Sequence, residues 1–163
     1  MLAMPVKAQQ KGKPMIKVLL VDDHPLFREG LKYRLSLDED IEVAAEAENG
    51  KQALELIKNN DFDIVYTSHC LEHVQNIVPL LLDIYRILKK GGHLLIRVPH
   101  VSYIDSLGDL THVRLFSYSS LDFLFFKYHQ QLRNDEIFKL IKRKIVFGKF
   151  YSYGLVLCNI VIV

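Results

Sequence analysis

Side chains that could bind a metal or move a proton lie in two parts of the sequence. One group is Asp22, Asp23 and His24, directly after a short apolar run. The other group consists of His69, Cys70, Glu72, His73, His100, Asp109 and His112. A zinc site needs three or four such ligands that converge at about 2.0–2.3 Å, but these residues have no dedicated metal-binding spacing. We therefore interpret them as ordinary loop residues, and adventitious metal binding stays open.

Ser68 precedes His69 and lies close to His73, a combination that could pair a nucleophile with a general base. Such catalysis also needs a nucleophile-elbow pattern and an acid that orients the base. Neither feature accompanies these residues. We therefore do not expect a hydrolytic reaction at Ser68.

An aromatic stretch with one lysine lies further along the chain. It contains Phe123, Phe125, Phe126, Lys127 and Tyr128. Aromatic rings beside a cation can stack nucleic-acid bases, but this stretch is more typical of core packing. The formal net charge of +2 is also too small to indicate nucleic acid. We expect no nucleic-acid partner, and a homodimer formed through exposed apolar surface stays open.

The length of 163 residues suits one domain with a substantial core. Residues 1–14 have no continuous apolar core, so they predict a disordered leader or a cloning remnant rather than a signal peptide. No apolar run approaches the ~20 residues that span a bilayer, and no membrane partner is expected. Cys70 and Cys158 form no CxxC pair, which favours a reducing, cytoplasmic location.

The elements that must position these side chains alternate between strand and helix. Strands are predicted at residues 16–21, 41–47, 64–67 and 93–98, and helices at 25–35, 52–59 and 76–89. This alternation indicates right-handed crossovers and a parallel sheet. Gly91 and Gly92 are expected to stop the third helix.

The pattern becomes less regular after Pro99. A long loop with one short helical turn is predicted at 102–117, and a helix that Ser119 or Ser120 caps is predicted to extend to about Gln131. Apolar stretches at 138–147 and 155–163 predict an antiparallel strand pair.

The first predicted helix has two distinct faces. Leu26, Phe27, Leu31 and Leu35 recur at helical spacing and predict the buried stripe. Arg28, Glu29, Lys32 and Arg34 are expected on the opposite face.

The segment VLLVDDHPLFREGL at 18–31 joins a buried strand, an acidic pair, a His-Pro step and a helix in that order. The segment AENG at 47–50, followed by Ala53 and Leu54, supports the same pattern. From Lys17 to about Asp63 the chain resembles the receiver domain of two-component response regulators. The resemblance is greatest to receivers that precede a helix-turn-helix output domain.

This resemblance implies an acidic pair that holds Mg²⁺ next to an aspartate that accepts a phosphoryl group. Asp22 and Asp23 match the metal-holding acids, because Mg²⁺ prefers carboxylate oxygens. The phosphoryl-accepting aspartate should lie five residues beyond Asp63, where this chain has Ser68. Serine cannot form an aspartyl phosphate, and it removes one anionic metal ligand. We expect at most weak Mg²⁺ binding and no phosphoryl signalling.

Four segments in the second half carry a different resemblance: DIVYTSHCLEHV at 63–74, LDIYRILKKGG at 82–92, LLIRVP at 94–99 and THVRLFS at 111–117. From about Asp61 to its end the chain resembles class I S-adenosylmethionine-dependent methyltransferases. The resemblance implies cofactor contacts at Ser68, His69, Leu71 and Glu72. It also marks His73, His112 and Arg114 as loop residues without an assigned role.

The first half lacks the features that would complete a methyltransferase site. The family has a glycine-rich turn after its first strand and an acid at the end of its second strand. Here the turn is Asp22-Asp23-His24-Pro25, with no glycine before Gly30. Glu46 or Glu48 could replace the ribose-binding acid, although an ordinary surface glutamate is the preferred interpretation. No bound cofactor is expected, and S-adenosylmethionine and Mg²⁺ remain the alternatives.

The two resemblances overlap at residues 61–68, which we call the junction. The receiver's third strand and the methyltransferase's fourth strand both lie beside the first strand of their sheets, so they occupy equivalent places. We therefore expect the strand order 41–47, 16–21, 64–67, 93–98, 155–163, 138–147. The predicted fold is a three-layer, doubly wound α/β domain with a mainly parallel Rossmann/flavodoxin-like sheet and an antiparallel C-terminal strand pair. Residues 15–62 would be the receiver-like part and 63–163 the methyltransferase-like part of a single domain.

These observations favour an engineered or recombined fold chimera that has no intact catalytic site and a structural rather than an enzymatic role. A natural fusion would usually join whole domains. One alternative is a degenerate methyltransferase that still binds S-adenosylmethionine. A second alternative is a pseudo-receiver that binds Mg²⁺ or a protein partner through Asp22 and Asp23.

Overall fold

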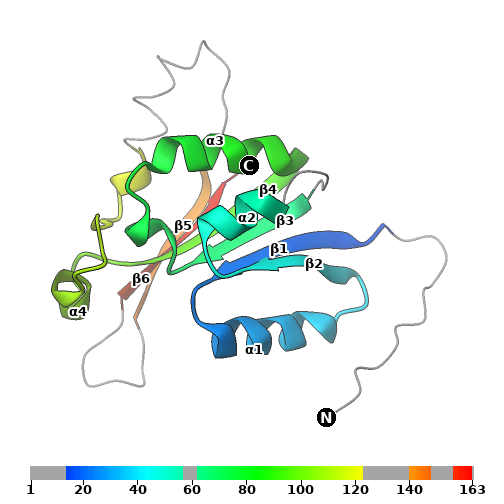
Figure 1. Cartoon of the computed structure of the whole chain (residues 1–163), viewed down its shortest axis with the longest axis horizontal. Coiled ribbons are helices and arrows are strands. Elements are labelled where there is room, and N and C mark those ends of the chain that lie inside the picture. The colour runs from blue at the N-terminus through cyan, green and yellow to red at the C-terminus, as the bar shows by residue number, and fades with distance from the viewer. Residues whose placement is uncertain (1–13, 57–61, 123–139, 148–155, 163) are drawn as a thin grey trace.

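The computed structural model describes residues 14–56, 62–122, 140–147 and 156–162 (Figure 1). Its elements follow in this order: β1 (Ile16–Asp22), α1 (Pro25–Ser36), β2 (Ile41–Ala47), α2 (Gly50–Leu56), β3 (Phe62–Ser68), a 3₁₀ turn (Leu71–His73), α3 (Ile77–Ile87), β4 (Leu88–Pro99), α4 (Ile104–Gly108), β5 (Leu140–Phe147) and β6 (Val156–Ile162). Residues 1–13 of the predicted leader (1–14) and most of the helix predicted at 119–131 lie outside the described residues.

The strands form one six-stranded sheet in the order β2-β1-β3-β4-β6-β5. The neighbours among β2, β1, β3 and β4 are parallel, whereas β6 is antiparallel to both β4 and β5. This is the predicted order, and the α/β fold class with its antiparallel C-terminal strand pair is confirmed.

The pairing of β1 with β3 joins the two resembling segments. The register runs from Val18 opposite Ile64 to Asp22 opposite Ser68. Neighbouring positions on one face of these strands, Leu19 and Val65, are almost completely buried. The junction therefore lies inside the sheet, and apolar residues from both segments belong to one hydrophobic core.

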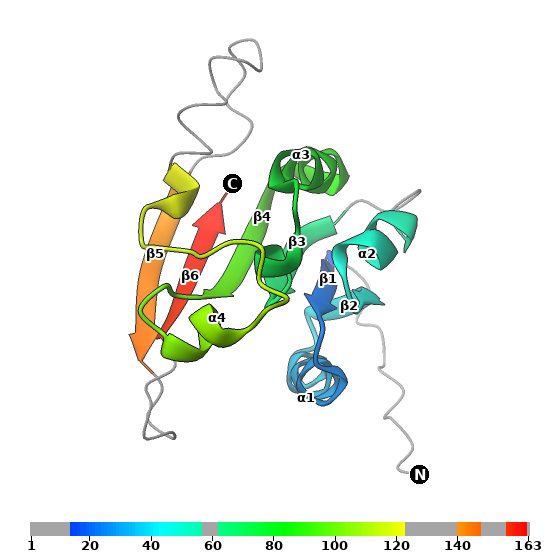
Figure 2. The ribbon, with the colours of Figure 1, turned by 60° about the vertical axis from the view of Figure 1, so that its left-hand side comes forward.

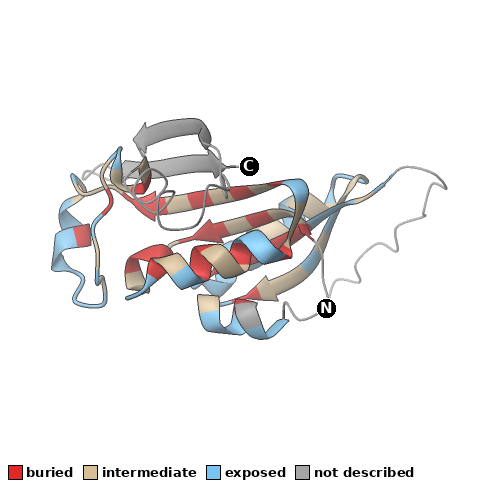
Figure 3. Ribbon diagram, turned by 90° about the horizontal axis from the view of Figure 1, so that it is seen from above, coloured by how far each residue is buried: buried red, intermediate tan, exposed pale blue. Residues whose placement is uncertain are grey.

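The helices lie on both faces of the sheet (Figures 1 and 2). Helix α1 lies on one face, and α2 and α3 lie on the other. The buried positions follow β3, β4 and the inward side of α3 (Figure 3). Helix α3 contributes Ile77, Leu80, Leu81, Ile84 and Ile87 to the core.

The prediction for the two faces of α1 was partly wrong. No residue of α1 is buried. Leu26 is 83% exposed, whereas the Arg28 side chain is only 17% exposed. The guanidinium of Arg28 donates a hydrogen bond to the Asp22 carbonyl oxygen at 2.6 Å. This polar contact at the end of β1 turns the arginine inward, and hydrophobic spacing alone does not encode it.

The boundary between α3 and β4 also differs from the prediction. The helix ends at Ile87, and the strand begins at Leu88, because Leu88 already pairs with Phe62 before a register irregularity. Gly91 has a φ of 78°, as expected for a turn glycine. A Cβ at Gly92 would lie 2.9 Å from the Lys89 carbonyl oxygen. The two glycines therefore form a bulge within β4 rather than the end of the helix.

Within the described part of the chain, no helix is both long and apolar enough to cross a membrane.

Candidate functional site

The candidate site lies at the carboxyl ends of β1 and β3, where open α/β sheets usually bind ligands. Asp22 ends β1 and Ser68 ends β3, and the two residues are register partners. His69 follows with a φ of 50°, an uncommon value for a residue with a side chain. Its N–H donates to the Arg97 carbonyl oxygen on β4 at 3.0 Å. This bend starts the connection that carries the 3₁₀ turn Leu71–His73.

The 3₁₀ turn places Glu72 inside the protein. The residue is 1% exposed, and neither side-chain oxygen has a hydrogen-bond partner among the described residues. The nearby imidazole of His69 has its Nδ1 3.5 Å from Glu72 Oε1. A buried carboxylate without hydrogen bonds is costly unless a cation or a proton neutralises it.

Two histidines lie beside this carboxylate. The His73 and His112 ring centroids are 5.0 Å apart. His73 Nδ1 lies 3.2 Å from the Thr111 carbonyl oxygen, and His112 Nδ1 lies 3.0 Å from the Ser106 carbonyl oxygen. A carbonyl can only accept, so each Nδ1 carries a proton and, in the neutral ring, each Nε2 is an available acceptor or ligand.

Asp22 and Asp23 lie next to this pair of histidines. Asp22 is 2% exposed; its Oδ1 accepts the His24 N–H at 2.8 Å, while Oδ2 is buried without a hydrogen bond from the described residues. Asp23 Oδ1 lies 2.7 Å from His24 Nδ1, and its Oδ2 lies 3.9 Å from His73 Nε2. The acidic turn and the histidines therefore meet at one edge of the sheet.

The serine and cysteine of this edge are poorly suited to nucleophilic chemistry. Ser68 is completely buried, and its hydroxyl has no hydrogen-bond partner among the described residues. The Cys70 thiol donates to the Ser68 carbonyl oxygen at 3.0 Å. Burial raises the pKa of the Cys70 thiol to about 12, and the carboxylates of Asp23 and Glu72 contribute to the rise. Cys70 therefore remains a neutral thiol rather than a reactive thiolate.

Arg114 holds the loop that carries His112. Its guanidinium donates to the Val74 carbonyl oxygen through Nε and Nη2, at 3.0 and 2.7 Å, and to the Gln75 carbonyl oxygen at 2.6 Å. The Val113 N–H donates to the Glu72 carbonyl oxygen at 2.9 Å. These contacts fasten the loop before Phe116 to the 3₁₀ turn. Arg114, which had no role assigned from the sequence, is therefore a positioning residue.

Asp109 stands at the rim of the same loop. Its Oδ1 accepts hydrogen bonds from the N–H and hydroxyl of Thr111 at 2.8 and 2.6 Å. These two hydrogen bonds hold the pKa of Asp109 below its usual value, and the positive charge that His112 can carry has the same effect. Asp109 Oδ2 lies 3.5 Å from His112 Nε2.

Most of the site residues expected from the sequence lie along this edge. They are Asp22, Asp23, Ser68, His69, Glu72, His73, His112 and Arg114. His100 instead contacts the Ser102 hydroxyl at 2.8 Å. The sequence could not reveal the carbonyl oxygens of Ser106 and Thr111 as partners of the histidines, because a backbone acceptor leaves no signal in residue type.

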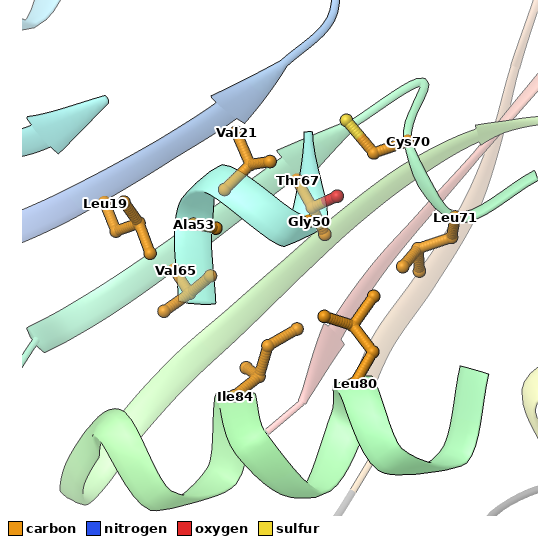
Figure 4. Close-up of a pocket in the computed structure, with 10 residues that line it drawn as sticks. All are labelled: Leu19, Val21, Gly50, Ala53, Val65, Thr67, Cys70, Leu71, Leu80 and Ile84. Carbon is orange, nitrogen blue, oxygen red and sulfur yellow. The ribbon is translucent and has the colours of Figure 1, made fainter. Parts of the chain in front are cut away.

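Leu71 faces a different space, a small apolar pocket between α2 and α3 (Figure 4). The pocket is lined by Leu19, Val21, Gly50, Ala53, Val65, Thr67, Cys70, Leu71, Leu80 and Ile84. It has room for about one water molecule. It therefore belongs to the core packing and is not a cofactor site.

Glu46, one of the two glutamates that could replace a ribose-binding acid, is already paired. Glu46 forms an ion pair with Lys32, and Arg28 Nε lies 3.8 Å from its Oε2. Both cations come from α1, on the same face of the sheet. Glu46 therefore contributes to the packing of α1 against β2, and its carboxylate is committed to these partners.

The fold and this edge place the protein among the doubly wound α/β proteins with a methyltransferase-like sheet. A solved S-adenosylmethionine-dependent methyltransferase from Archaeoglobus fulgidus is similar with a TM-score of 0.61 and 17% sequence identity, over 92% of this chain and 86% of that one. The N-methyltransferase NodS from Bradyrhizobium japonicum is similar with a TM-score of 0.53 and 12% identity, over 91% and 86% of the two chains. At these identities the similarity concerns the fold alone.

The N-terminal part is similar in sequence to another family. Residues 18–76, less than half of the chain, match the response regulator receiver domain. The transcriptional regulatory protein DegU of Brevibacillus brevis is 37% identical over 57 residues, which are 35% of this chain and 24% of that protein. The nitrate/nitrite response regulator protein NarL of Escherichia coli is 46% identical over 48 residues, 29% and 22% of the two chains.

The chain therefore spans about a quarter of the length of these two curated relatives. A receiver-like N-terminal half and a methyltransferase-like C-terminal half were predicted. Both resemblances are confirmed, and the methyltransferase-like fold extends over most of the chain.

Proposed function

We propose that this protein is an engineered or recombined fold chimera with a structural role and no intact catalytic site. The observation that carries the proposal is the register pair of Asp22 and Ser68 at the junction. This pair occupies the position where one parent family would place its phosphoryl-accepting acid and the other would begin its cofactor site. The residues present complete neither.

Phosphoryl transfer is disfavoured by the state of both side chains. Ser68 has no exposed surface and no general base hydrogen-bonded to its hydroxyl among the described residues. Asp22 accepts the His24 N–H through one oxygen and keeps only the other for a metal ion. Mg²⁺ would obtain Asp22 and Asp23 without a third carboxylate, so its binding is expected to be weak.

Methyl transfer is disfavoured by the turn after β1. S-adenosylmethionine needs close approach of the backbone there, which a glycine-rich turn permits. Here the Asp22 carboxylate accepts the His24 N–H, the Asp23 carboxylate lies 2.7 Å from His24 Nδ1, and Pro25 begins α1 directly afterwards. Glu46 is committed to Lys32 and Arg28. These residues do not fit the cofactor.

Titration calorimetry with S-adenosylmethionine and labelling with acetyl phosphate in the presence of Mg²⁺ test this proposal. We expect no saturable heat with the cofactor and no incorporation of phosphate, while the receiver domain of DegU, as a positive control, is labelled. Saturable micromolar binding of S-adenosylmethionine would support the degenerate methyltransferase instead. Phosphate on Ser68, Asp22 or Asp23 would support the pseudo-receiver.

The proposal includes a cytoplasmic location and a protein without nucleic-acid or membrane partners. The free thiol of Cys70 agrees with a reducing compartment. A homodimer through exposed apolar side chains such as Leu26 and Phe27 also belongs to it. Light scattering across a dilution series measures the mass, and a monomer at all concentrations would remove the dimer from the proposal.

A further inference from the structure

We propose that Glu72, His73 and His112 form a binding site for a zinc-class divalent metal ion. One ligand atom from each of these residues lies within 4.8 Å of the others. In a tetrahedral zinc site, ligand atoms at about 2.0–2.1 Å from the metal lie about 3.3 Å from one another. Side-chain movements on the order of 1 Å would therefore close the three ligands around an ion.

The orientation of both histidines supports metal binding. Each imidazole uses Nδ1 to donate to a backbone carbonyl oxygen, Thr111 for His73 and Ser106 for His112. Metal-ligating histidines commonly make such a hydrogen bond, because it fixes the tautomer and directs the lone pair of Nε2 toward the ion. Here it leaves the two Nε2 atoms available on adjacent rings.

Glu72 is the independent observation that points to a cation. Its carboxylate is almost completely buried and accepts no hydrogen bond from the described residues. A divalent ion would supply the positive counter-charge that this buried carboxylate needs. His69 Nδ1, at 3.5 Å from Oε1, is the competing partner if it is protonated. The two explanations differ in what a substitution at Glu72 does to metal affinity.

The surroundings define the character of the site. The three protein ligands come from the 3₁₀ turn after β3 and from the loop before Phe116, which Arg114 holds together. The His73 side chain is 31% exposed, so solvent and ions can reach this group of residues. Asp23 Oδ2 and Asp109 Oδ2 lie 3.9 and 3.5 Å from the Nε2 atoms of His73 and His112, and they add negative charge at the rim.

The ion would therefore link two connections, the 3₁₀ turn Leu71–His73 and the loop that carries His112. Imidazole and carboxylate ligands with an open position suit Zn²⁺, and Co²⁺ can report on the same geometry by its visible absorption. This inference does not depend on the proposed function, since a silent fold and an active one could both carry such a site.

The test is calorimetric titration of the metal-free protein with Zn²⁺, together with the visible spectrum after addition of Co²⁺. We expect one saturable Zn²⁺ site of micromolar or tighter affinity and a tetrahedral cobalt spectrum. Glu72→Gln, His73→Gln and His112→Gln should each weaken binding by at least tenfold. His100→Gln, which changes a histidine outside the site, should bind Zn²⁺ as the unchanged protein does.

Three results would overturn the proposal. The first is the absence of saturable binding by the folded protein. The second is unchanged affinity in Glu72→Gln, which would leave the contact with His69 as the role of this carboxylate. The third is a loss of Zn²⁺ binding in His24→Gln while His112→Gln binds Zn²⁺ as the unchanged protein does. That result would assign the ion to the acidic turn. Circular dichroism confirms that each variant is folded, and His112→Gln provides a test if Glu72→Gln is not.

Discussion

Two carboxylates at opposite ends of β3 have contrasting environments. Asp63, near the amino end, is only partly buried, yet it accepts the Lys17 N–H at 2.8 Å and two contacts from Lys89 Nζ at 2.8 and 2.9 Å. Glu72, beyond the carboxyl end, is almost completely buried and accepts no hydrogen bond from the described residues. If stability alone mattered, the hydrogen bonds would be found at Glu72 rather than at Asp63, because a buried carboxylate loses more free energy without hydrogen-bond partners.

This difference distinguishes the two edges of the sheet. The edge at the amino end of β3 is held together by ion pairs and hydrogen bonds, whereas the edge at its carboxyl end has buried polar atoms without hydrogen bonds from the described residues, as in a binding site. Lys17 lies on β1, Asp63 on β3 and Lys89 on β4, so the contacts of Asp63 help to fasten β1 to β3 and β4. At the carboxyl ends, buried oxygen atoms of Asp22, Ser68 and Glu72 lack partners in the described part of the chain. Four predictions test this contrast.

The largest effect is expected at Glu72. Replacement with methionine, which has a similar volume, removes a buried carboxylate that accepts no hydrogen bond from the described residues. In buffer with a chelator, Glu72→Met should raise the free energy of unfolding by about 1–4 kcal/mol. Urea denaturation measures the change, with Glu42→Gln on the exposed surface as the control. A loss of stability of similar size would show that Glu72 has a stabilising partner in the metal-free protein.

The bulge beside the edge at the amino end of β3 should respond in the opposite direction. A Cβ at Gly92 would lie 2.9 Å from the Lys89 carbonyl oxygen and 3.1 Å from the Asp63 carbonyl oxygen. Gly92→Ala should therefore lower the free energy of unfolding by about 1–3 kcal/mol. Gly30→Ala on α1, where no atom lies within 4 Å of the added Cβ, is the matched control and should preserve or raise stability. Equal effects of the two substitutions would refute this account of the bulge.

Asp63 itself should contribute a smaller amount. Asp63→Asn weakens the ion pair with Lys89 and the hydrogen bond from Lys17, so it should lower the free energy of unfolding by about 1–2 kcal/mol at neutral pH. Thermal and urea denaturation measure the loss. If the variant is as stable as the unchanged protein, the contacts of Asp63 do not fasten β1 to β3 and β4.

The contribution of Asp63 should also depend on pH. Burial raises the pKa of Asp63, but the hydrogen bonds and charges of Lys89 and Lys17 outweigh it, so the pKa in the folded protein lies below the ordinary value of 3.8. The stabilisation is therefore complete above the unfolded-state pKa and is lost as the pH falls through the folded-state pKa. The stability difference from Asp63→Asn should shrink below about pH 4. A difference that grows on acidification would have the wrong sign.

The sequence predicted the sheet order because two family patterns meet at equivalent strands. Once Ile64–Thr67 is placed beside Ile16–Val21, the neighbours of the parallel strands follow from the crossovers. The places of the two antiparallel strands came from the methyltransferase resemblance, which left it open whether 155–163 pairs inside the sheet or with a neighbouring molecule. The inward turn of Arg28 was not predictable, because it depends on a carbonyl oxygen of Asp22 and on Glu46 across the α1–β2 contact. The early start of β4 depends likewise on the pairing of Leu88 with Phe62.

The candidate site was predictable in its location but not in its environment. The ends of parallel strands bring Asp22, Ser68 and the histidines together. That Glu72 is buried could not be inferred, because a glutamate between Leu71 and His73 ordinarily indicates a solvent-facing charge. Its burial follows from the backbone of His69 at φ 50° and from the tight turn that comes after it.

The position of β6 between β4 and β5 has a consequence for biosynthesis (Figure 2). On the ribosome, residues 88–99 emerge well before their antiparallel neighbour at 156–162. During that interval the backbone amides and carbonyls along one side of β4 have no strand to bind, and such an exposed side can recruit another chain. Slow translation of residues 100–162 would lengthen that interval, so the yield of soluble protein should depend on how quickly that segment is read.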